Sequence, residues 1–288
     1  MGSIPASRTN NFFQNTREYS MRPEPAKWQD AATELVRQHR AREAFAALRV
    51  ELAPDGVPAA YLIQDNYVAK LLEQRRTSLA GYKIAITTPA MRDMVGFHDS
   101  VSGCLLSDQV YRSGHRIVAR DFVRLIVEFE IAFELARDLP APGSPWTSAT
   151  ILPYVACAYP ALEIADDRCA DYPSLRRSVL TLIADNAWNQ GLVLGPPVTA
   201  LDADALQAME GIAFIDEREI GRGTGRDVLG HPLNALAWLA NHLQSRALPL
   251  KAGEIVTTGS LVKSQFPQAG NRVAFRLPGF GEVQLDIE

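Results

Sequence analysis

Three glutamates in apolar surroundings are the residues whose types and spacing suggest chemistry. Glu128 and Glu130 lie in the run LIVEFEIAFEL, and Glu163 lies in PALEIADDR. Side chains two positions apart in a strand point to the same side, so Glu128 and Glu130 share one face, about 7 Å apart along the chain. Buried carboxylates this close repel each other and lose their hydration, and a divalent cation relieves both effects. An oxygen-only set of three donors favours Mg²⁺ or Mn²⁺ over zinc or copper.

A simpler interpretation of this strand remains open. Polar residues on the outer face of a strand are the commonest pattern, and this face would then be exposed to solvent. The face that carries Glu128 and Glu130 also carries Ile126 and Ala132, so it is mixed, whereas the opposite face is wholly apolar. The pattern therefore permits a metal site without requiring one.

A lysine in a second apolar run is the next candidate. Lys83 lies in GYKIAI, and its simpler interpretation is a surface lysine whose stem covers apolar neighbours. Beside a cation its ammonium pKa falls, which suits a donor or acceptor of protons. An octahedral ion with three protein ligands keeps three positions for water or substrate. A 2-oxo acid can chelate such an ion, which then acts as a Lewis acid and stabilises an enolate.

The helices and strands that position these residues can be predicted from the sequence, and together they indicate a strand-dominated α+β fold with a helical N-terminal part. Helical spacing of apolar residues predicts one or two helices in 28–52 and another in 59–79, and a third helix is predicted over 231–247, with Pro232 at its start. Short apolar runs bounded by turn residues predict strands at 82–86, 125–135, 162–166, 192–195, 254–259, 272–277 and 282–287. We expect three parts: a poorly ordered tail (1–25), a helical N-terminal cap (26–80) and a catalytic β-rich domain (81–288).

Composition narrows the class of protein. The formal net charge over 288 residues is −4, whereas proteins that bind nucleic acid usually carry a basic stripe. The charge therefore argues against nucleic acid and against an anionic membrane surface as partners. Three widely spaced cysteines, without a CxxC pair, predict neither a disulfide framework nor a zinc site. No apolar run reaches the ~20 residues that span a bilayer, and the polar N-terminus does not resemble a secretory signal. We expect a cytoplasmic protein.

Seven ordered blocks resemble one known family over about residues 60–288. They are AYLIQ, GYKIAITT, VEFEIAFELARDL, PALEIADDR, ADNAWNQGLVLG, VLGHPLNALAWLANHL and LKAGEIVTTGSL. This chain resembles the hydratase/decarboxylase branch of the fumarylacetoacetate hydrolase superfamily. The resemblance implies a mixed β-sandwich roll with a helical N-terminal portion, and a Mg²⁺ or Mn²⁺ ion held by Glu128, Glu130 and Glu163. It also implies that Lys83 is the active-site lysine.

The reaction implied by this resemblance is the metal-dependent hydration of a 2-hydroxy-2,4-dienoate. Water adds across the distal double bond after ketonisation, and the product is a 4-hydroxy-2-oxo acid. Related members decarboxylate 4-oxalocrotonate through the same metal-stabilised enolate, so decarboxylation is the alternative activity. Family members are usually homo-oligomers that serve aromatic-compound degradation. The alternative to an enzyme is a repurposed, non-catalytic homologue, although this chain keeps all three glutamates and Lys83.

The chain departs from the family pattern around this core. Within the segment 96–101, Asp99 is retained as a candidate proton-transfer group beside Lys83. The usual DNASS stretch is DNAWN here, with Trp188 and Asn189 in place of two small hydroxyl residues. Ser260, in TTGS, is a candidate hydrogen-bond donor to a substrate carboxylate. These differences bear on which 2-oxo acid the chain accepts.

Overall fold

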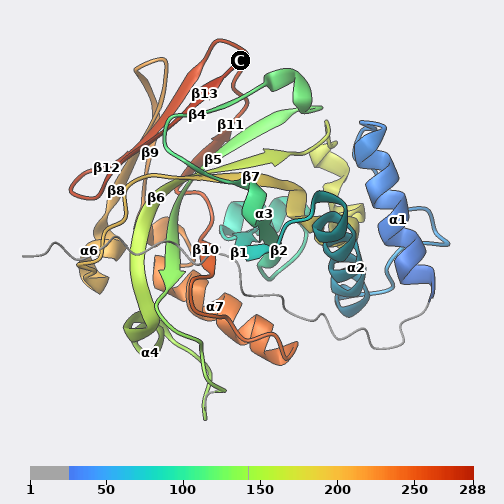
Figure 1. The fold of residues 1–288 in the computed structure, drawn as a ribbon, viewed down its shortest axis with the longest axis horizontal. Coiled ribbons are helices and arrows are strands. Elements are labelled where there is room, and N and C mark those ends of the chain that lie inside the picture. Colours follow the sequence, from blue (N-terminus) through green and yellow to red (C-terminus); the bar gives the residue numbers. More distant parts are fainter. Residues whose placement is uncertain (1–25, 142) are drawn as a thin grey trace, which may run out of the picture.

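Two mixed β-sheets form the centre of the molecule in the computed structural model, which describes residues 26–141 and 143–288 (Figure 1). The predicted tail, residues 1–25, lies outside the described residues. The first sheet has the strand order β2-β1-β10-β5-β6-β7-β3, and β11 pairs with β5. Its strands are β1 (Leu79–Ala85), β2 (Val101–Leu106), β3 (Val110–Arg112), β5 (Leu125–Leu135), β6 (Val155–Asp166), β7 (Asn189–Leu194), β10 (Ile255–Thr257) and β11 (Val262–Gln265).

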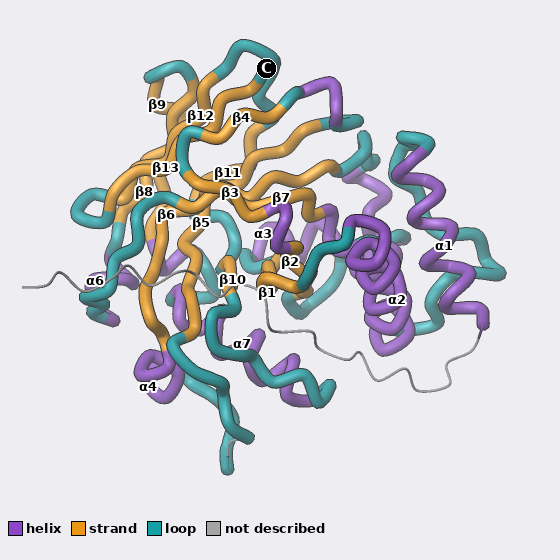
Figure 2. Tube along the Cα trace, in the orientation of Figure 1, coloured by secondary structure: helices purple, strands orange, loops and turns teal. Residues whose placement is uncertain are grey.

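The second sheet is smaller and has the order β4-β13-β12-β8-β9. Its strands are β4 (His115–Ile117), β8 (Glu210–Ile215), β9 (Arg218–Thr224), β12 (Arg272–Leu277) and β13 (Gly281–Ile287). Both sheets contain parallel and antiparallel pairs, because β1 runs parallel to β10 and β13 runs parallel to β4. In Figure 2 the long strands of the two sheets fill the upper left, α1 and α2 lie to the right, and α4 and α7 lie below.

The apolar face of β5 supplies the core between the sheets. Phe129 and its alternate neighbours Val127, Ile131 and Phe133 are fully buried. The ring of Phe129 lies 5.6 Å from that of Phe275 on β12 of the second sheet. Burial of apolar surface on this scale is the main stabilising contribution to such a fold. The other face of β5 is left to carry the glutamates, as its alternating pattern predicts.

The helices lie around the two sheets (Figure 1). They are α1 (Ala26–Arg40), α2 (Val57–Arg75), α3 (Pro89–Val95), α4 (Ser148–Ile151), α5 (Val179–Ala184), α6 (Ala203–Ala208) and α7 (Pro232–Ser245). The helices α1 and α2 pack on each other, and α2 also packs on α5 and β2. In Figure 1, α1 and α2 lie to the right of the strands, and α7 lies below them. No helix of the described residues is long and apolar enough to cross a membrane.

Sequence patterns located about half of the α-helices and strands of the described residues. All seven predicted strand runs lie on strands, and α7 begins at Pro232, as expected. The prediction that helix extends through 41–52 is wrong, because α1 ends at Arg40 and Arg42 adopts a left-handed φ of 55°. The chain then runs without helix so that Phe45 N donates to Arg168 O at 2.8 Å. A tertiary contact therefore overrides the local helical spacing.

Candidate active site

The three glutamates converge at the centre of the first sheet. Glu128 and Glu130 lie on one face of β5, and Glu163 lies on β6 directly opposite Glu128. Directly paired residues on neighbouring strands have side chains on the same face. One carboxylate oxygen from each glutamate lies within 4.8 Å of the others. Glu130 and Glu163 are 0% exposed and Glu128 is half-buried, so the simpler interpretation, a solvent-exposed face, is wrong.

Each glutamate has a hydrogen bond that fixes one of its oxygens. Ser264 Oγ donates to Glu128 Oε1 at 2.6 Å, and Gly259 N donates to Glu130 Oε2 at 2.9 Å. Asn189 Nδ2 donates to Glu163 Oε1 at 3.0 Å. The second oxygens, Glu130 Oε1 and Glu163 Oε2, are buried and have no hydrogen-bond partner. Each of these two carboxylates is therefore oriented by one atom and free at the other.

These residues fit a divalent cation. A buried polar atom without a partner destabilises the fold, and an unpaired buried charge does so more strongly. Here two such oxygens lie in a cluster of three carboxylates. Lys83 is the positive charge that lowers the pKa values of Glu130 and Glu163, and it cannot balance three negative charges. A hard cation would neutralise the excess charge and occupy the free oxygens. The donor set contains neither histidine nor cysteine, which matches an ion that prefers oxygen ligands.

Lys83 supplies the ammonium beside the carboxylates. Its side chain is 3% exposed, so the alternative of a surface lysine is wrong. Lys83 Nζ lies 3.1 Å from Glu163 Oε1 and donates to Ala187 O at 3.3 Å. Burial alone would lower the pKa of Lys83, but the charges of Glu163, Glu128 and Glu130 outweigh it and raise that pKa. In the protein without metal, Lys83 is therefore held in its charged form.

The pKa values of two of the carboxylates are raised as well, which favours their uncharged form. Burial, followed by repulsion from Glu163 and Glu128, raises the pKa of Glu130 well above its usual value. Burial also raises the pKa of Glu163 to about 7, although Lys83 opposes the shift. Perturbed pKa values of this kind concentrate at functional sites.

The other two candidate residues are placed less centrally. Asp99 is exposed, and its Oδ1 accepts from Trp238 Nε1 at 2.9 Å and from Ser100 N at 2.8 Å. Ser260 Oγ accepts from Phe129 N at 2.8 Å and donates to Val262 O at 2.7 Å. These bonds tie both side chains to the protein itself, and their roles in proton transfer and substrate binding stay predictions.

Sequence reasoning did not assign roles to several residues that orient the site. Asn189 belongs to the ADNAWNQGLVLG block, just before the predicted strand 192–195, and its departure from the family pattern was the available signal. Ser264 and the amide of Gly259 carry no comparable signal, because strand β11 and the loop before it reach the glutamates only in the folded chain. Ala187 acts through its carbonyl, which a sequence pattern does not specify.

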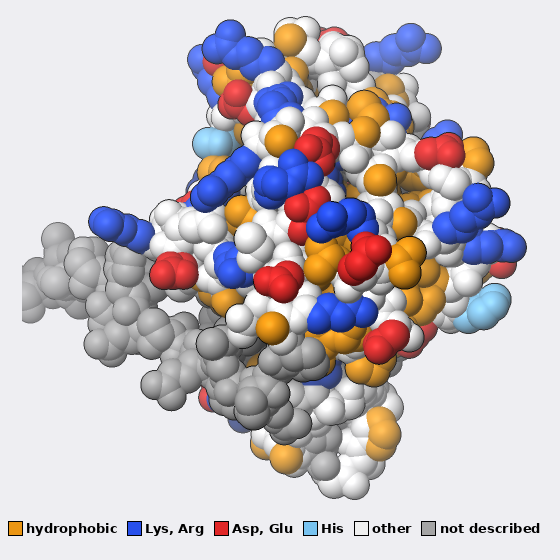
Figure 3. Space-filling model, turned by 90° about the vertical axis from the view of Figure 1, so that its right-hand side faces the viewer, with side chains coloured by type: hydrophobic (Ala, Val, Ile, Leu, Met, Phe, Trp, Pro, Cys, Tyr) orange, Lys and Arg blue, Asp and Glu red, His pale blue; other side chains and the backbone are white. Residues whose placement is uncertain are grey.

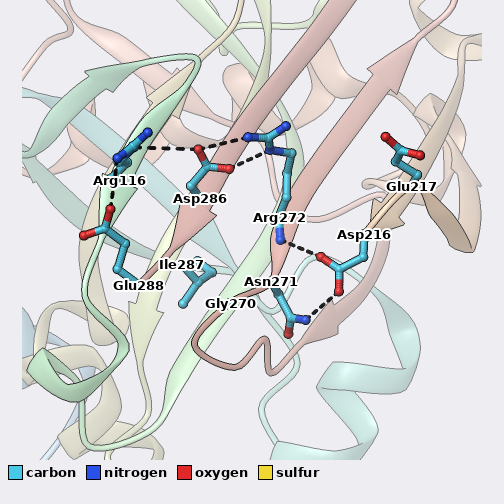
Figure 4. Close-up of a pocket in the computed structure, with 9 residues that line it drawn as sticks. All are labelled: Arg116, Asp216, Glu217, Gly270, Asn271, Arg272, Asp286, Ile287 and Glu288. Atoms are coloured by element: carbon cyan, nitrogen blue, oxygen red, sulfur yellow. Dashed lines mark hydrogen bonds and ion pairs between the residues drawn. The ribbon is translucent and has the colours of Figure 1, made fainter.

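A surface hollow of about 440 Å³ lies away from the glutamates, beside the second sheet (Figure 4). It is lined by charged residues that already pair with one another, among them Arg272 with Asp286 at 2.6 Å and Arg116 with Glu288 at 3.2 Å. Figure 3 views the molecule from the side of α1 and α2, where basic and acidic side chains are interspersed. Neither feature gathers groups suited to chemistry, so the buried cluster remains the candidate site.

Comparison with known proteins identifies the family of this chain. The family described as "Fumarylacetoacetate (FAA) hydrolase C-terminal" matches residues 65–288. The chain belongs to the fumarylacetoacetate hydrolase family. The predicted resemblance is therefore confirmed, and the matched region contains all three glutamates and Lys83.

Relatives within the fumarylacetoacetate hydrolase family include named hydratases. A "2-keto-4-pentenoate hydratase" of Paraburkholderia phymatum is 34% identical over 259 residues, which cover 89% of this chain and 95% of that protein. A "2-oxo-hept-4-ene-1,7-dioate hydratase" of Escherichia coli is 32% identical over 237 residues, covering 81% and 87%. Among solved structures, 4-oxalocrotonate decarboxylase from Pseudomonas putida G7, complexed with magnesium and adipate, superposes with a TM-score of 0.82. It is 20% identical, with 91% of this chain and 98% of that chain covered, so it shows the fold alone.

Proposed function

We propose that this protein is a divalent-metal-dependent hydro-lyase that adds water to a 2-hydroxy-2,4-dienoate and forms a 4-hydroxy-2-oxo acid. The observation that carries the proposal is the convergence of three glutamates and Lys83 in a buried cluster with two unpartnered carboxylate oxygens. The relatives from Paraburkholderia phymatum and Escherichia coli, each more than 30% identical, are both named hydratases, which supports hydration over the alternative of decarboxylation.

Glu128, Glu130 and Glu163 would hold the cation, with Mg²⁺ or Mn²⁺ as the expected ion. The oxygens of Glu130 and Glu163 that lack hydrogen bonds are the atoms available to it. When bound, the cation supplies Lewis acidity to a 2-oxo acid and offsets negative charge that develops on the keto oxygen. The structural neighbour, 4-oxalocrotonate decarboxylase, is complexed with magnesium, and this property of that protein supports the choice of ion.

Lys83 would hold and move the proton. Its ammonium lies against Glu163 and Ala187 O in a buried setting, so its direction is fixed before substrate arrives. In hydration, one hydrogen is added to a carbon of the dienoate and a hydroxyl group to another, so a group that delivers a proton is required. Lys83 is the proposed donor, and it would regain a proton from the water that supplies the hydroxyl group, so that the sum of the step is one water added. Asp99, which is exposed, is proposed to assist by exchanging protons with water.

Apolar residues on both sides of the carboxylates suit the hydrocarbon part of such a substrate. On the face of β5 that bears the glutamates, Ile126 lies at one end and Ala132 at the other, and both are buried. On β6, Ala165 lies opposite Ile126 and Ala161 lies opposite Glu130, and both alanines are buried. A dry, apolar surround strengthens the electrostatic interactions of the charged groups inside it. Ser260 remains a proposed contact for the substrate carboxylate.

Product analysis by NMR tests the proposal. Wild-type protein with Mg²⁺ or Mn²⁺ should convert 2-hydroxypenta-2,4-dienoate to a 4-hydroxy-2-oxo acid, and chelation should abolish the conversion. Release of CO₂ from 4-oxalocrotonate, with no hydration of the dienoate, would assign the protein to the decarboxylases instead. Turnover of neither compound would contradict both activities and favour a repurposed homologue. The expected homo-oligomer is tested by light scattering on the same sample.

A further inference from the structure

An unusual backbone turn lies directly before β7. Asn186, Ala187 and Trp188 have left-handed φ values of 53°, 46° and 64° in succession. Residues with a Cβ rarely adopt this conformation, and three in a row are strained. Backbone strain of this kind persists only where surrounding contacts enforce it, and it clusters at functional sites. The contacts that enforce it here show what the turn does.

The side chain of Asn186 fixes the turn to the edge strand β2. Asn186 Oδ1 accepts from Cys104 N at 2.6 Å, and Asn186 Nδ2 donates to Cys104 O at 3.0 Å, so both amide atoms are used. Asn186 is 2% exposed. The neighbour of Cys104 is Gly103, which pairs with Lys83 in the sheet. A Cβ on Gly103 would lie 2.6 Å from Asn186 O, so the turn lies directly against the strand beside Lys83.

The other end of the same segment reaches both members of the central ion pair. Ala187 O accepts from Lys83 Nζ at 3.3 Å, and Asn189 Nδ2 donates to Glu163 Oε1 at 3.0 Å. That Glu163 oxygen is also the one 3.1 Å from Lys83 Nζ. Because Asn189 and Lys83 both engage Oε1, Oε2 is left without a hydrogen bond. Asn189 Oδ1 is likewise buried and unpartnered.

We propose that the segment Asn186–Asn189 is a positioning element that sets Lys83 and Glu163 relative to each other. Asn186 locks the strained turn so that Ala187 O directs the Lys83 ammonium. Asn189 holds Glu163 by one oxygen and leaves the other to the cation. The inference rests on the proposed function for its catalytic part, whereas its metal-binding part needs only that the glutamates bind a cation. Hydrogen-bonded partners of metal ligands typically change metal affinity by about 10–100-fold when they are removed.

The test compares three variants of the full-length chain. Asn189→Leu keeps the approximate size of the side chain and removes its hydrogen bond, and Asn186→Ala removes the clamp on Cys104. Asn241→Ala is the matched control, because Asn241 makes the same pair of bonds to Trp146 N and O, at 2.8 and 2.9 Å, away from the glutamates. Should Asn186→Ala fail to fold, Asn186→Asp keeps an acceptor for Cys104 N and replaces the donor to Cys104 O by a second carboxylate oxygen, which adds a buried charge.

Two readouts separate the roles. By titration calorimetry, Asn189→Leu should bind Mn²⁺ about 10–100-fold more weakly than wild type, whereas Asn186→Ala and Asn241→Ala should bind it nearly as tightly. In hydratase assays, Asn186→Ala should lower kcat by about tenfold or more with little change in KM, as expected when a transition-state interaction is lost. Asn241→Ala should leave both constants close to those of wild type.

Clear results would overturn the inference. Wild-type Mn²⁺ affinity in Asn189→Leu would remove the role of Asn189, and a kcat for Asn186→Ala equal to that of the control would remove the role of Asn186. If wild type hydrates no dienoate, the proposed function fails, yet the Mn²⁺ affinities still decide the role of Asn189. A crystal structure of Asn186→Ala would then decide the other role. The inference requires that Ala187 O has moved away from Lys83 Nζ, and an unchanged contact contradicts it.

Discussion

Removing the charge of Asp185 should destabilise the fold strongly, because the buried guanidinium of Arg168 would lose its ion-pair partner. Asp185 Oδ2 accepts from Arg168 Nη2 at 2.5 Å, and Oδ1 lies 2.5 Å from His39 Nε2. The side chains of Asp185 and Arg168 are 0% and 1% exposed. Breaking one side of a buried ion pair costs about 3–5 kcal/mol. Asp185→Asn should therefore lower the unfolding temperature by about 6–20 °C, at roughly 2–4 °C per kcal/mol for a chain of this size class.

Differential scanning calorimetry on metal-free protein measures this effect, and its dependence on pH adds a second check. Burial alone would raise the pKa of Asp185, but His39 and Arg168 outweigh it and lower that pKa. A lowered pKa contributes stability above the unfolded-state value of about 3.9, and the contribution is lost as the pH falls through the folded-state value. The difference in unfolding temperature between wild type and Asp185→Asn should shrink as the pH falls below about pH 4.

The exposed pair of Arg272 and Asp286 provides the control. Their side chains are 58% and 24% exposed, so solvent screens the interaction. Asp286→Asn should shift the unfolding temperature much less than Asp185→Asn does. Equal shifts for the two variants, or a shift for Asp185→Asn that is independent of pH down to about pH 3, would refute the reasoning.

Three further predictions concern the active site. Lys83→Met should abolish hydration while Mn²⁺ still binds, because the ammonium of Lys83 is not a metal ligand. Loss of Mn²⁺ binding in calorimetry would show that Lys83 does more than transfer a proton. Asp99→Asn should lower kcat without changing Mn²⁺ affinity, and unchanged kinetics would remove Asp99 from the mechanism. Gly103→Ala should reduce kcat sharply, because the added Cβ would lie 2.6 Å from Asn186 O in the positioning turn. Gly143→Ala is the control, because no atom lies within 4 Å of its added Cβ. Equal kcat values for the two variants would exclude this steric effect.

The sequence predicted the central elements of the site because their signal is local. Charged residues such as Glu128, Glu130, Glu163 and Lys83 are unusual within an apolar strand. Alternation alone places Glu128 and Glu130 on one face of their strand. Whether that face was buried depended on the second strand and on what covers it, which alternation does not encode. The structure supplies this through the direct pairing of Glu128 with Glu163 and through the burial of Lys83.

Other features depend on contacts between distant segments and could not be predicted from local patterns. The non-helical stretch after Arg40 forms because Phe45 bonds to the backbone of Arg168, which lies far along the chain. The hydrogen bond of Ser264 to Glu128 arises only when β11 pairs with β5. Short strands such as β3 and β4 have three residues each, too few to show a period.

Calorimetric titration of Mn²⁺ into metal-free wild type and Glu130→Gln tests the central claim most directly. Gln matches Glu in shape but removes a buried charge that the neighbouring carboxylates disfavour, so the metal-free variant should be at least as stable as wild type. We predict one binding site per chain in wild type and a loss of at least about 100-fold in affinity in Glu130→Gln. Equal affinity in the two proteins, or no binding to folded wild type, would contradict the assignment of this cluster as a metal site.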